Sequence, residues 1–395
     1  MADEFNDKLN ISYTDENLPV PTKDLAIKHC FCSYTVYSLI YFILINNPFF
    51  QNYFVKELKF YYVIAFTLYV LISPFIYLIF RPKSLYKSHN IEICDYLFKL
   101  IGLIFSKNTI LKDSYKVIAE KIKPTYYQKQ SLMAMFIKAF FGTLMVKFFF
   151  SDIQYIISNK AVIGPIFNNL FANFSFEHFK HVLAVNSNYL YGYAVMLLYT
   201  VDVAFFAVGY LTECAFLNNK IRTVDTNIFG VLICLICYPP FNNITTTFLG
   251  WNQNNYAMIH DKNLLILSWA FRIIALCFLV IYASASVALG TRASNLTNRG
   301  TVSRFPYNIV RHPAYISKNM FWLLTTIPLL IVNLDFIQDN FVNYLKTLLL
   351  VICSVVFWAL IYYARAITEE RHLMQDPEYQ EYAQKVKWRF IPHVF

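Results

Sequence analysis

Long runs of apolar residues, separated by short polar and basic segments, dominate the pattern of the 395-residue chain. A transmembrane helix needs about 20 mostly apolar residues to cross the hydrocarbon core of a bilayer. The pattern predicts an all-α fold, a polytopic integral membrane bundle of about eight transmembrane helices, whose last two form a carboxy-terminal helical hairpin. The predicted spans are roughly Cys30–Ile45, Phe60–Phe80, Ser131–Ile157, Tyr189–Leu211, Ile228–Gly250, Leu264–Gly290, Ala314–Val332 and Leu345–Ile367.

Two further segments mix apolar residues with polar ones. Arg81–Gln130 alternates apolar and basic residues, which indicates an interfacial amphipathic helix, and the phenylalanine-rich Asn168–Leu183 is expected to lie on the membrane surface as well. The sequence therefore predicts a polar cytoplasmic N-terminus over residues 1–29 and an N-terminal membrane region with interfacial segments over residues 30–188. The membrane domain that carries the motifs described below covers residues 189–395.

The composition supports a membrane protein and argues against a soluble enzyme or a disordered chain. Hydrophobic residues make up 57% of the chain and charged residues 15%, whereas an average soluble domain carries about 25% charged residues. The net charge of +10 would suggest nucleic-acid binding in a soluble protein. Here the basic residues lie between apolar segments, so we expect them to face anionic lipid head groups. The expected partners are membrane lipids, and no nucleic acid.

The distribution of basic residues predicts the topology. With the spans above, 25 of the 34 Lys and Arg residues fall on one side of the membrane and six on the other. Because basic residues are retained in the cytoplasm, both termini of this multi-pass protein are expected to be cytoplasmic. The membrane would be the inner or plasma membrane in a bacterium and the endoplasmic reticulum in a eukaryote.

Two features inside the predicted spans could carry chemistry. Asp202 lies in the middle of an apolar run, where a carboxylate is costly unless it faces a partner or a cavity. It either contacts a substrate or ion or makes an inter-helix hydrogen bond to Arg272 or a tyrosine, and we favour the hydrogen bond. Cys234 and Cys237 form a CxxC motif inside an apolar run, without a second CxxC or a nearby histidine pair. We therefore expect no metal.

The residues that most strongly indicate a function lie at the start and at the end of the last two spans. The motif RHPAY at 311–315 lies before the first of them, and Arg365 and Glu369 lie at the end of the second. In a helical hairpin these two ends lie on the same side of the membrane. Pro313 fits the first turn of a helix, where free N–H groups favour an anion, and Arg365 and Glu369 share one helix face. We expect a pocket with a cation, an anion, an imidazole and phenols, suited to a zwitterionic cofactor with an aromatic part.

Simpler interpretations exist for each of these residues. Histidine and arginine at a cytoplasmic helix start are common anchors to lipid head groups, and Arg365 and Glu369 could form a plain surface ion pair, worth less than about 1 kcal/mol. Their occurrence together and in this order favours a functional site.

This combination resembles the isoprenylcysteine carboxyl methyltransferase and phospholipid methyltransferase superfamily. The signature of that superfamily is RHPxY, a hairpin, a pair of glutamates and an aromatic-rich tail ending near proline, and it is matched over Arg299–Pro392. The chain looks closest to the bacterial isoprenylcysteine-methyltransferase-like branch. That likeness extends upstream through Tyr199–Val203, Cys237–Phe241 and Ser294–Thr297, and it covers roughly half of the chain.

The resemblance implies that S-adenosyl-L-methionine binds on the cytoplasmic side of the last hairpin. It implies that Glu369 contacts the cofactor and that Arg365 faces the methyl-accepting group. Two positions depart from the pattern of the family, which often has glycine where this chain has Phe305 and Ser317. The residues that match cofactor-binding positions are Arg299, Gly300, Thr301, Val302, Tyr307, His312, Pro313, Ala314, Tyr315 and Glu369.

The expected activity is that of a membrane S-adenosylmethionine-dependent methyltransferase, transferring a methyl group to oxygen or nitrogen of a lipophilic or lipid-linked acceptor. A carboxylate acceptor needs no base and would be oriented by Arg365, whereas an amine needs a base such as Glu369 or Glu370. Two alternatives remain. One is a membrane NADPH-dependent reductase of the sterol-reductase type, whose tail resembles residues 386–392. The other is a non-catalytic transporter or scaffold, which Asp202 would fit.

Overall fold

The structure is a computed structural model, and the part of the chain that it describes is mostly helical. Two strands of two residues each are its β-structure within the described residues. The chain divides into two compact units, residues 1–139 and residues 140–395, and each is described by itself below. The described residues are 19–51, 56–105, 115–172, 175–213, 217–243, 265–332 and 337–394.

The first unit is a group of helices packed around α2. The hydroxyl oxygen of Thr22 caps α2 by accepting a hydrogen bond from the N–H of Leu25 over 3.2 Å. Helix α2 contacts α4 and α5, and a buried hydrogen bond of 2.7 Å joins His29 Nδ1 to the hydroxyl of Ser88. The helices among the described residues of this unit are α2 (Lys23–Asn46), α3 (Pro48–Gln51), α4 (Lys56–Ile79), η2 (Lys83–Lys87), α5 (His89–Phe105), α7 (Tyr115–Ile122) and the first part of α8, which begins at Tyr126.

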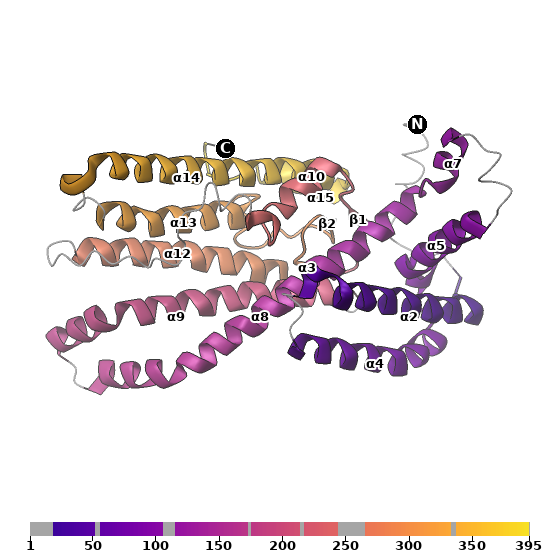
Figure 1. The fold of residues 1–395 in the computed structure, drawn as a ribbon, viewed down its shortest axis with the longest axis horizontal. Helices are drawn as coiled ribbons and strands as arrows, with labels where there is room; N and C mark the ends of the chain where they lie inside the picture. Colours follow the sequence, from indigo (N-terminus) through magenta and orange to yellow (C-terminus); the bar gives the residue numbers. More distant parts are fainter. Residues whose placement is uncertain are drawn as a thin grey trace. The chain divides into compact units, whose positions relative to one another are not determined.

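The second unit contains four long helices that lie side by side in the order α9, α12, α13 and α14 (Figure 1). Aromatic side chains form much of the core between them, including Tyr191, Tyr282, Trp322, Trp358 and Tyr362. The elements of this unit are the second part of α8 (Tyr126–Ala172), α9 (Phe176–Leu211), β1 (Thr223–Val224), α10 (Ile228–Leu235), α12 (Leu265–Leu289), η3 (Gly290–Arg292), β2 (Thr297–Asn298), α13 (Pro313–Val332), α14 (Ile337–Leu373) and α15 (Pro377–Lys385).

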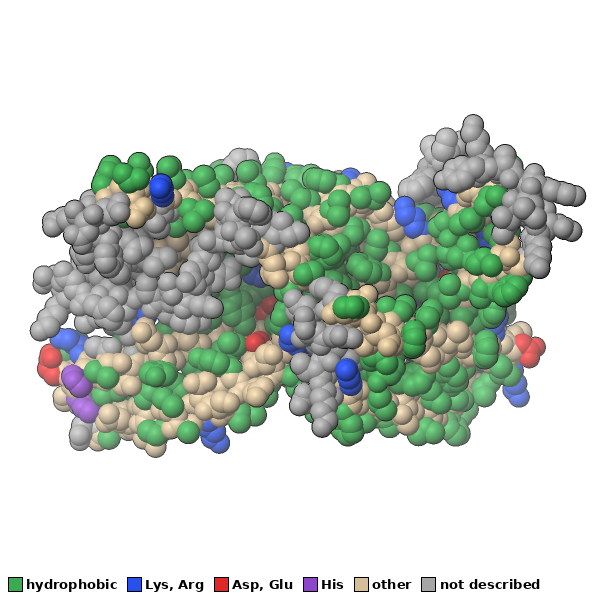
Figure 2. Space-filling view, in the orientation of Figure 1, with side chains coloured by type: hydrophobic (Ala, Val, Ile, Leu, Met, Phe, Trp, Pro, Cys, Tyr) green, Lys and Arg blue, Asp and Glu red, His purple; other side chains and the backbone are tan. Residues whose placement is uncertain are grey.

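The polytopic α-helical membrane architecture is confirmed in its coarse form. Six helices in the described part of the chain are long and apolar enough to cross a membrane. The face shown in Figure 2 is mostly hydrophobic, with few charged side chains. The helix α8 has 47 residues, which corresponds to about 70 Å, more than twice the roughly 30 Å of a hydrocarbon core. Part of this helix must therefore extend beyond the bilayer.

One predicted span is wrong in the described part of the chain. The run Ile228–Gly250 was expected to be a transmembrane helix, but α10 ends at Leu235 after eight residues, or about 12 Å. Turns follow it, at the position of Pro239 and Pro240, and residues 244–250 lie outside the described part.

Two other predicted segments have different limits in the structure. The span Ser131–Ile157 is only the central part of α8. In the segment Asn168–Leu183, expected on the membrane surface, residues 168–172 are the end of α8 and residues 176–183 are the first turns of α9. Of the interfacial segment Arg81–Gln130, the residues in η2, α5 and α7 are helical.

Candidate functional site

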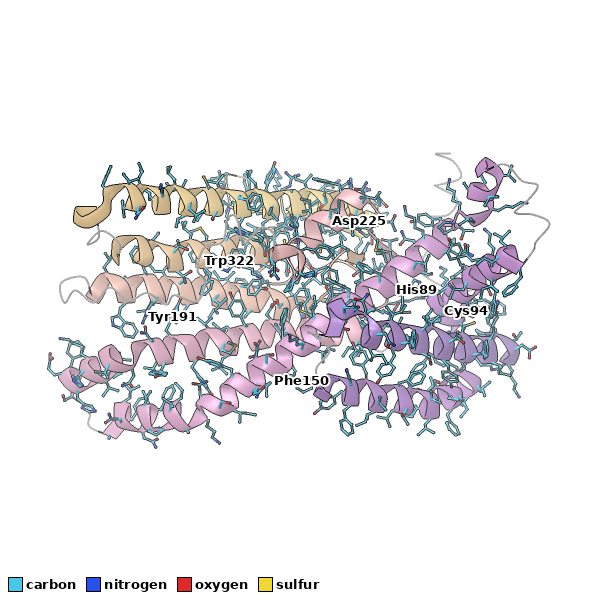
Figure 3. The ribbon with its side chains drawn as sticks, in the orientation of Figure 1. His89, Cys94, Phe150, Tyr191, Asp225 and Trp322 are labelled. Atoms are coloured by element: carbon cyan, nitrogen blue, oxygen red, sulfur yellow. The ribbon has the colours of Figure 1, made fainter. Side chains whose placement is uncertain are left out.

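The start of α13 and the end of α14 meet at one end of the second unit. The hydroxyl of Tyr315 on α13 donates a hydrogen bond to Glu369 Oε2 on α14 over 2.6 Å, across 54 positions of sequence. The Glu369 side chain is 42% exposed, and its Oε2 lies 3.8 Å from His312 Nδ1. Asp225, labelled in Figure 3, lies at the same end of α14 and pairs with Arg371 over 3.2 Å. The two helices thus bring an imidazole, a phenol and a partly exposed carboxylate together.

Glu370 has a different environment from its neighbour. Its carboxylate is 5% exposed and accepts hydrogen bonds of 2.7 Å from Arg311 Nε and from Arg389 Nε, one on each oxygen. His312 Nε2 lies 3.1 Å from the same oxygen that Arg311 contacts. Because both oxygens are held by guanidinium groups, Glu370 is poorly suited to act as a base. Its geometry is that of a buried charge that ties the chain after α15 to the start of α13.

Arg365 is buried among aromatic rings rather than exposed in a surface ion pair. Its side chain is 7% exposed, and Nη2 donates a hydrogen bond to Asn295 Oδ1 over 2.8 Å. The guanidinium carbon lies 5.1 Å from the ring centre of Tyr315, 5.7 Å from that of Tyr362 and 5.9 Å from that of Tyr238. Arg365 and Glu369 share a helix face but have different partners, so the interpretation as a plain surface ion pair is wrong. The rings hold the cation in a fixed position.

Asn295 and Tyr238 belong to the site, although no role was predicted for either of them. The amide of Asn295 bridges Arg365 and Tyr238, because it accepts from the first and its Nδ2 donates to the hydroxyl of the second over 2.9 Å. The backbone N–H of Asn295 donates to the hydroxyl of Tyr210 over 2.7 Å. Both residues lie in the upstream stretches that resemble the methyltransferase superfamily. This resemblance was the one indication in the sequence that they could belong to the site.

The backbone at the start of α13 is paired, contrary to the expectation of free N–H groups for an anion at Arg311 and His312. The N–H of Arg311 donates to the carbonyl of Trp388 and the N–H of His312 donates to the carbonyl of Arg389, each over 2.9 Å. These amides are used to hold the carboxy-terminal tail. Pro313 occupies the first helical position, as expected.

Arg299 and Gly300 are held by contacts with other parts of the chain. Arg299 is 4% exposed, and its Nη1 donates to the carbonyls of Asn219 and Thr212 over 2.8 and 3.3 Å. Burial lowers the pKa of this guanidinium, because the charged form loses its hydration. Gly300 has a φ of +94°, and a Cβ there would lie 2.8 Å from Arg222 Nη2. The positive φ and the close approach of Arg222 are sufficient reasons for a glycine at this position, so no ligand contact is needed to account for it.

The remaining residues of this stretch have structural contacts as well. Tyr307 packs against Tyr379 and Tyr382, and its carbonyl accepts a hydrogen bond from the hydroxyl of Tyr382 over 2.8 Å. Burial raises the pKa of the Tyr307 hydroxyl well above its usual value. The carbonyl of Thr301 accepts a hydrogen bond from Arg292, and Val302 is half-buried.

A narrow cleft lies between α14, α10 and β2. Its volume is about 20 Å³, enough for about one water molecule. Burial raises the pKa of the Cys234 thiol in its wall to about 12, so this cysteine stays protonated and is no nucleophile at neutral pH. The polar and charged residues of the lining include Asp225, Asn295, Tyr315, Arg365, Glu369 and His372.

A second group of charges lies deeper in the helices. Asp202 on α9 accepts hydrogen bonds from the hydroxyl of Tyr282, over 2.7 Å, and from that of Ser286, both on α12. The expected inter-helix hydrogen bond is confirmed, with a tyrosine as its partner; Arg272 instead donates to Asn188 over 2.5 Å.

Lys318 on α13 completes this group, and sequence reasoning overlooked it. Its Nζ lies 5.2 Å from the ring centres of both Tyr282 and Trp322, within electrostatic reach of Asp202 and Arg365. The rings of Trp322 and Tyr362 lie 5.7 Å apart. A continuous row of rings therefore connects the lysine to the guanidinium of Arg365.

Comparisons of the chain with family models, with curated proteins and with solved structures found no match. The assignment of a function therefore depends on the motifs and on the geometry of this site.

Proposed function

We propose that the chain is an integral membrane S-adenosyl-L-methionine-dependent methyltransferase that acts on a lipophilic or lipid-linked acceptor. In this proposal the cofactor binds at the cytoplasmic ends of α13 and α14, which form a hairpin, and both termini are cytoplasmic. The membrane is the inner or plasma membrane of a bacterium or the endoplasmic reticulum of a eukaryote.

One observation carries the proposal. Glu369 and Arg365 lie on the same face of α14, but Glu369 is partly exposed and Arg365 is buried, and they have different partners. Glu369 is a partly exposed carboxylate held by Tyr315. Arg365 is a buried cation held by Asn295 and surrounded by rings. A fixed anion beside a fixed cation, both in the wall of one cleft, is complementary to a zwitterionic ligand and to a negatively charged acceptor.

The side chains in the cleft fit S-adenosylmethionine in their chemistry. A carboxylate suits its positive sulfonium and amino groups, and the phenol, imidazole and amide groups supply hydrogen bonds. The cleft is too small for the whole cofactor at about 20 Å³. Binding therefore requires the cleft to widen, and the partly exposed side chain of Glu369 marks the side of the cleft from which a ligand can enter.

When bound, the cofactor supplies a methyl group on a positively charged sulfur that is also the leaving group. The residues of this chain then have to bind and orient the reactants, which is a major source of catalysis in such displacements. Glu369 binds the positive end, and Tyr315 positions Glu369. Arg365 orients the acceptor through two parallel N–H groups.

We favour a carboxylate over an amine as the acceptor group. An amine needs a base that takes its proton, but Glu370 has both oxygens engaged by arginines and Glu369 is assigned to the cofactor in this proposal. A carboxylate needs no base and matches the charge and planar geometry of Arg365. The aromatic core beside Arg365 favours an acceptor with an apolar body.

The deciding experiment is a titration of the detergent-purified full chain with S-adenosylmethionine and, separately, with NADPH. We expect saturable binding of S-adenosylmethionine that weakens at least tenfold in Glu369→Gln. Glu381→Gln is the matched control, because Glu381 pairs with Lys385 on the surface of α15. Binding of NADPH alone would support the reductase alternative, and binding of neither would refute the proposed function.

A further inference from the structure

A second cavity lies on a different face of α13 from the cleft. Its volume is about 380 Å³, within the range of ligand sites, and no polar atom contributes to its surface. It is bounded by α12, by the loop before α13, by α13 and by the carboxy-terminal tail. The residues that define it are Phe278, Ile281, Ile316, Met320, Phe390 and Ile391.

The position of the cavity on α13 separates it from the proposed methyl-transfer site. With 3.6 residues per helical turn, Ile316 and Met320 lie roughly 100–140° around the helix axis from Tyr315, which lines the cleft. A molecule in the cavity therefore has the body of α13 between itself and Arg365. It cannot be the acceptor in the position that the proposed function requires.

Water finds few hydrogen-bonding partners in this cavity, which is partly open to its surroundings. A buried water needs two to four polar partners, and the one hydroxyl in the lining, that of Ser317, donates to the carbonyl of Pro313 over 2.6 Å. An apolar hollow of this size at the surface is a site where apolar groups bind. An apolar group from outside the described helices is the suitable occupant.

The surroundings indicate which apolar group this is. Phe278 and Ile281 belong to α12, in a segment that is apolar and long enough to cross a membrane, so the medium beside the cavity at that depth is lipid. Phe305, Ile309 and Ile391 in the non-helical rim are 45–56% exposed, as expected of side chains that contact hydrocarbon. Arg304, which precedes the rim residue Phe305 in the chain, is an exposed cation.

From these observations we propose that the cavity binds one acyl chain of a membrane phospholipid. The apolar walls take the chain, and Arg304, whose guanidinium also donates to the carbonyl of Ala288 over 2.6 Å, lies where a phosphate head group would be. The tail residues Phe390 and Ile391 touch the bound chain. The same tail pairs with the N–H groups of Arg311 and His312, so the lipid would hold the tail in place.

The test uses the purified full chain in detergent with a trace of phosphatidylglycerol that carries a photoreactive group in one acyl chain. We expect adducts on Ile316 and Met320 that saturate and that unlabelled phosphatidylglycerol displaces. Adducts on Leu360, an exposed residue of α14, should rise linearly and resist competition. Each methylene removed from the buried part of the chain should weaken binding about fourfold.

Met320→Trp and Ile316→Trp both fill the cavity, and either should reduce labelling of the remaining wall at least tenfold. Leu360→Trp is the matched control and should not. Competition by free palmitate as effective as that by phosphatidylglycerol would refute the head-group contact at Arg304. Equal, unsaturable labelling at Met320 and Leu360, or adducts that persist in both cavity variants, would overturn the site. S-adenosylmethionine is absent from this experiment, so its result is independent of the proposed function.

Discussion

The hydroxyl of Tyr315 and the carboxylate of Glu369 are joined by a 2.6 Å hydrogen bond between two helices that are consecutive in the chain. The tyrosine ring also stacks on His312, with 5.2 Å between ring centres and 11° between planes. On its other side it lies 5.1 Å from the guanidinium of Arg365. One phenol thus contacts each of the three charged or titratable groups expected at the site.

Tyr315→Phe should weaken the binding of S-adenosylmethionine by about threefold to tenfold, because it removes the hydroxyl that positions Glu369 and leaves the ring in place. Calorimetry on the purified variant measures this change. Glu369→Gln should have the larger effect, since it removes the negative charge itself. A loss in Tyr315→Phe that exceeds the loss in Glu369→Gln would mean that the phenol contacts the cofactor directly.

Arg365→Lys should separate acceptor orientation from cofactor binding. Lysine keeps the charge and loses the planar pair of donors. Affinity for S-adenosylmethionine should stay within a few-fold, while single-turnover methyl transfer to a lipid extract should fall by about tenfold to a thousandfold, on the scale of losing an oriented electrostatic contact. Equal loss of cofactor affinity in Arg365→Lys and Glu369→Gln would show that the arginine has no separate role toward the acceptor.

Glu370→Ala should destabilise the second unit strongly. The substitution leaves Arg311 and Arg389 without the carboxylate that both contact, and breaking a buried ion pair costs about 3–5 kcal/mol. Denaturant unfolding in detergent micelles measures the change in free energy. Glu381→Gln removes a carboxylate from the surface of α15 and should leave the unfolding midpoint unchanged. Unfolding of Glu370→Ala that matches this control would contradict the structural role.

Asp202 and Lys318 should be energetically coupled. Asp202→Asn keeps an acceptor for Tyr282 but removes the negative charge near Lys318. In a double-mutant cycle with Lys318→Gln, the double variant should be more stable than the sum of the single variants by about 0.5–3 kcal/mol. Additive changes in the free energy of unfolding would show that the two charges do not interact.

The topology can be tested with single cysteines in a background without the native ones. Ser303→Cys and Gln380→Cys, both at exposed positions, should react with an impermeant maleimide only from the cytoplasmic side. Lys180→Cys, an exposed position near the start of α9, should react only from the opposite side. Labelling of residue 303 from outside would contradict both the orientation and the access of a cytosolic cofactor.

The sequence predicted the membrane helices better than their ends. Hydropathy identifies apolar runs, but the polar residues Asn159 and Lys160 continue α8 beyond its apolar part, because a helix satisfies its own backbone in water as well as in lipid. Hydropathy also misjudged Ile228–Gly250. This run is apolar on average, but Pro239 and Pro240 lie in its middle. Proline has no backbone N–H to donate, so a continuous helix would lose hydrogen bonds there.

For the candidate site, the sequence predicted the residues that belong to the motifs. It did not predict residues that are distant in the sequence and contact the site only in the folded chain. Glu369 and Tyr315 follow from two consecutive spans and helical spacing. Asn295 contacts Arg365 across 70 positions of sequence, and no periodicity relates the two. Gly300 was assigned to cofactor binding by its place in a motif, whereas in the structure its neighbour is Arg222.

The pairing of Glu370 with both Arg311 and Arg389 affects the order in which contacts can form during synthesis. Arg311 is made before Glu370, but Arg389 follows it by 19 residues. Until residue 389 has left the ribosome, one oxygen of the Glu370 carboxylate lacks its partner. The backbone N–H of His312 lacks its partner for the same time, because it donates to the carbonyl of Arg389. This end of the bundle therefore acquires its full set of contacts only after the tail has emerged.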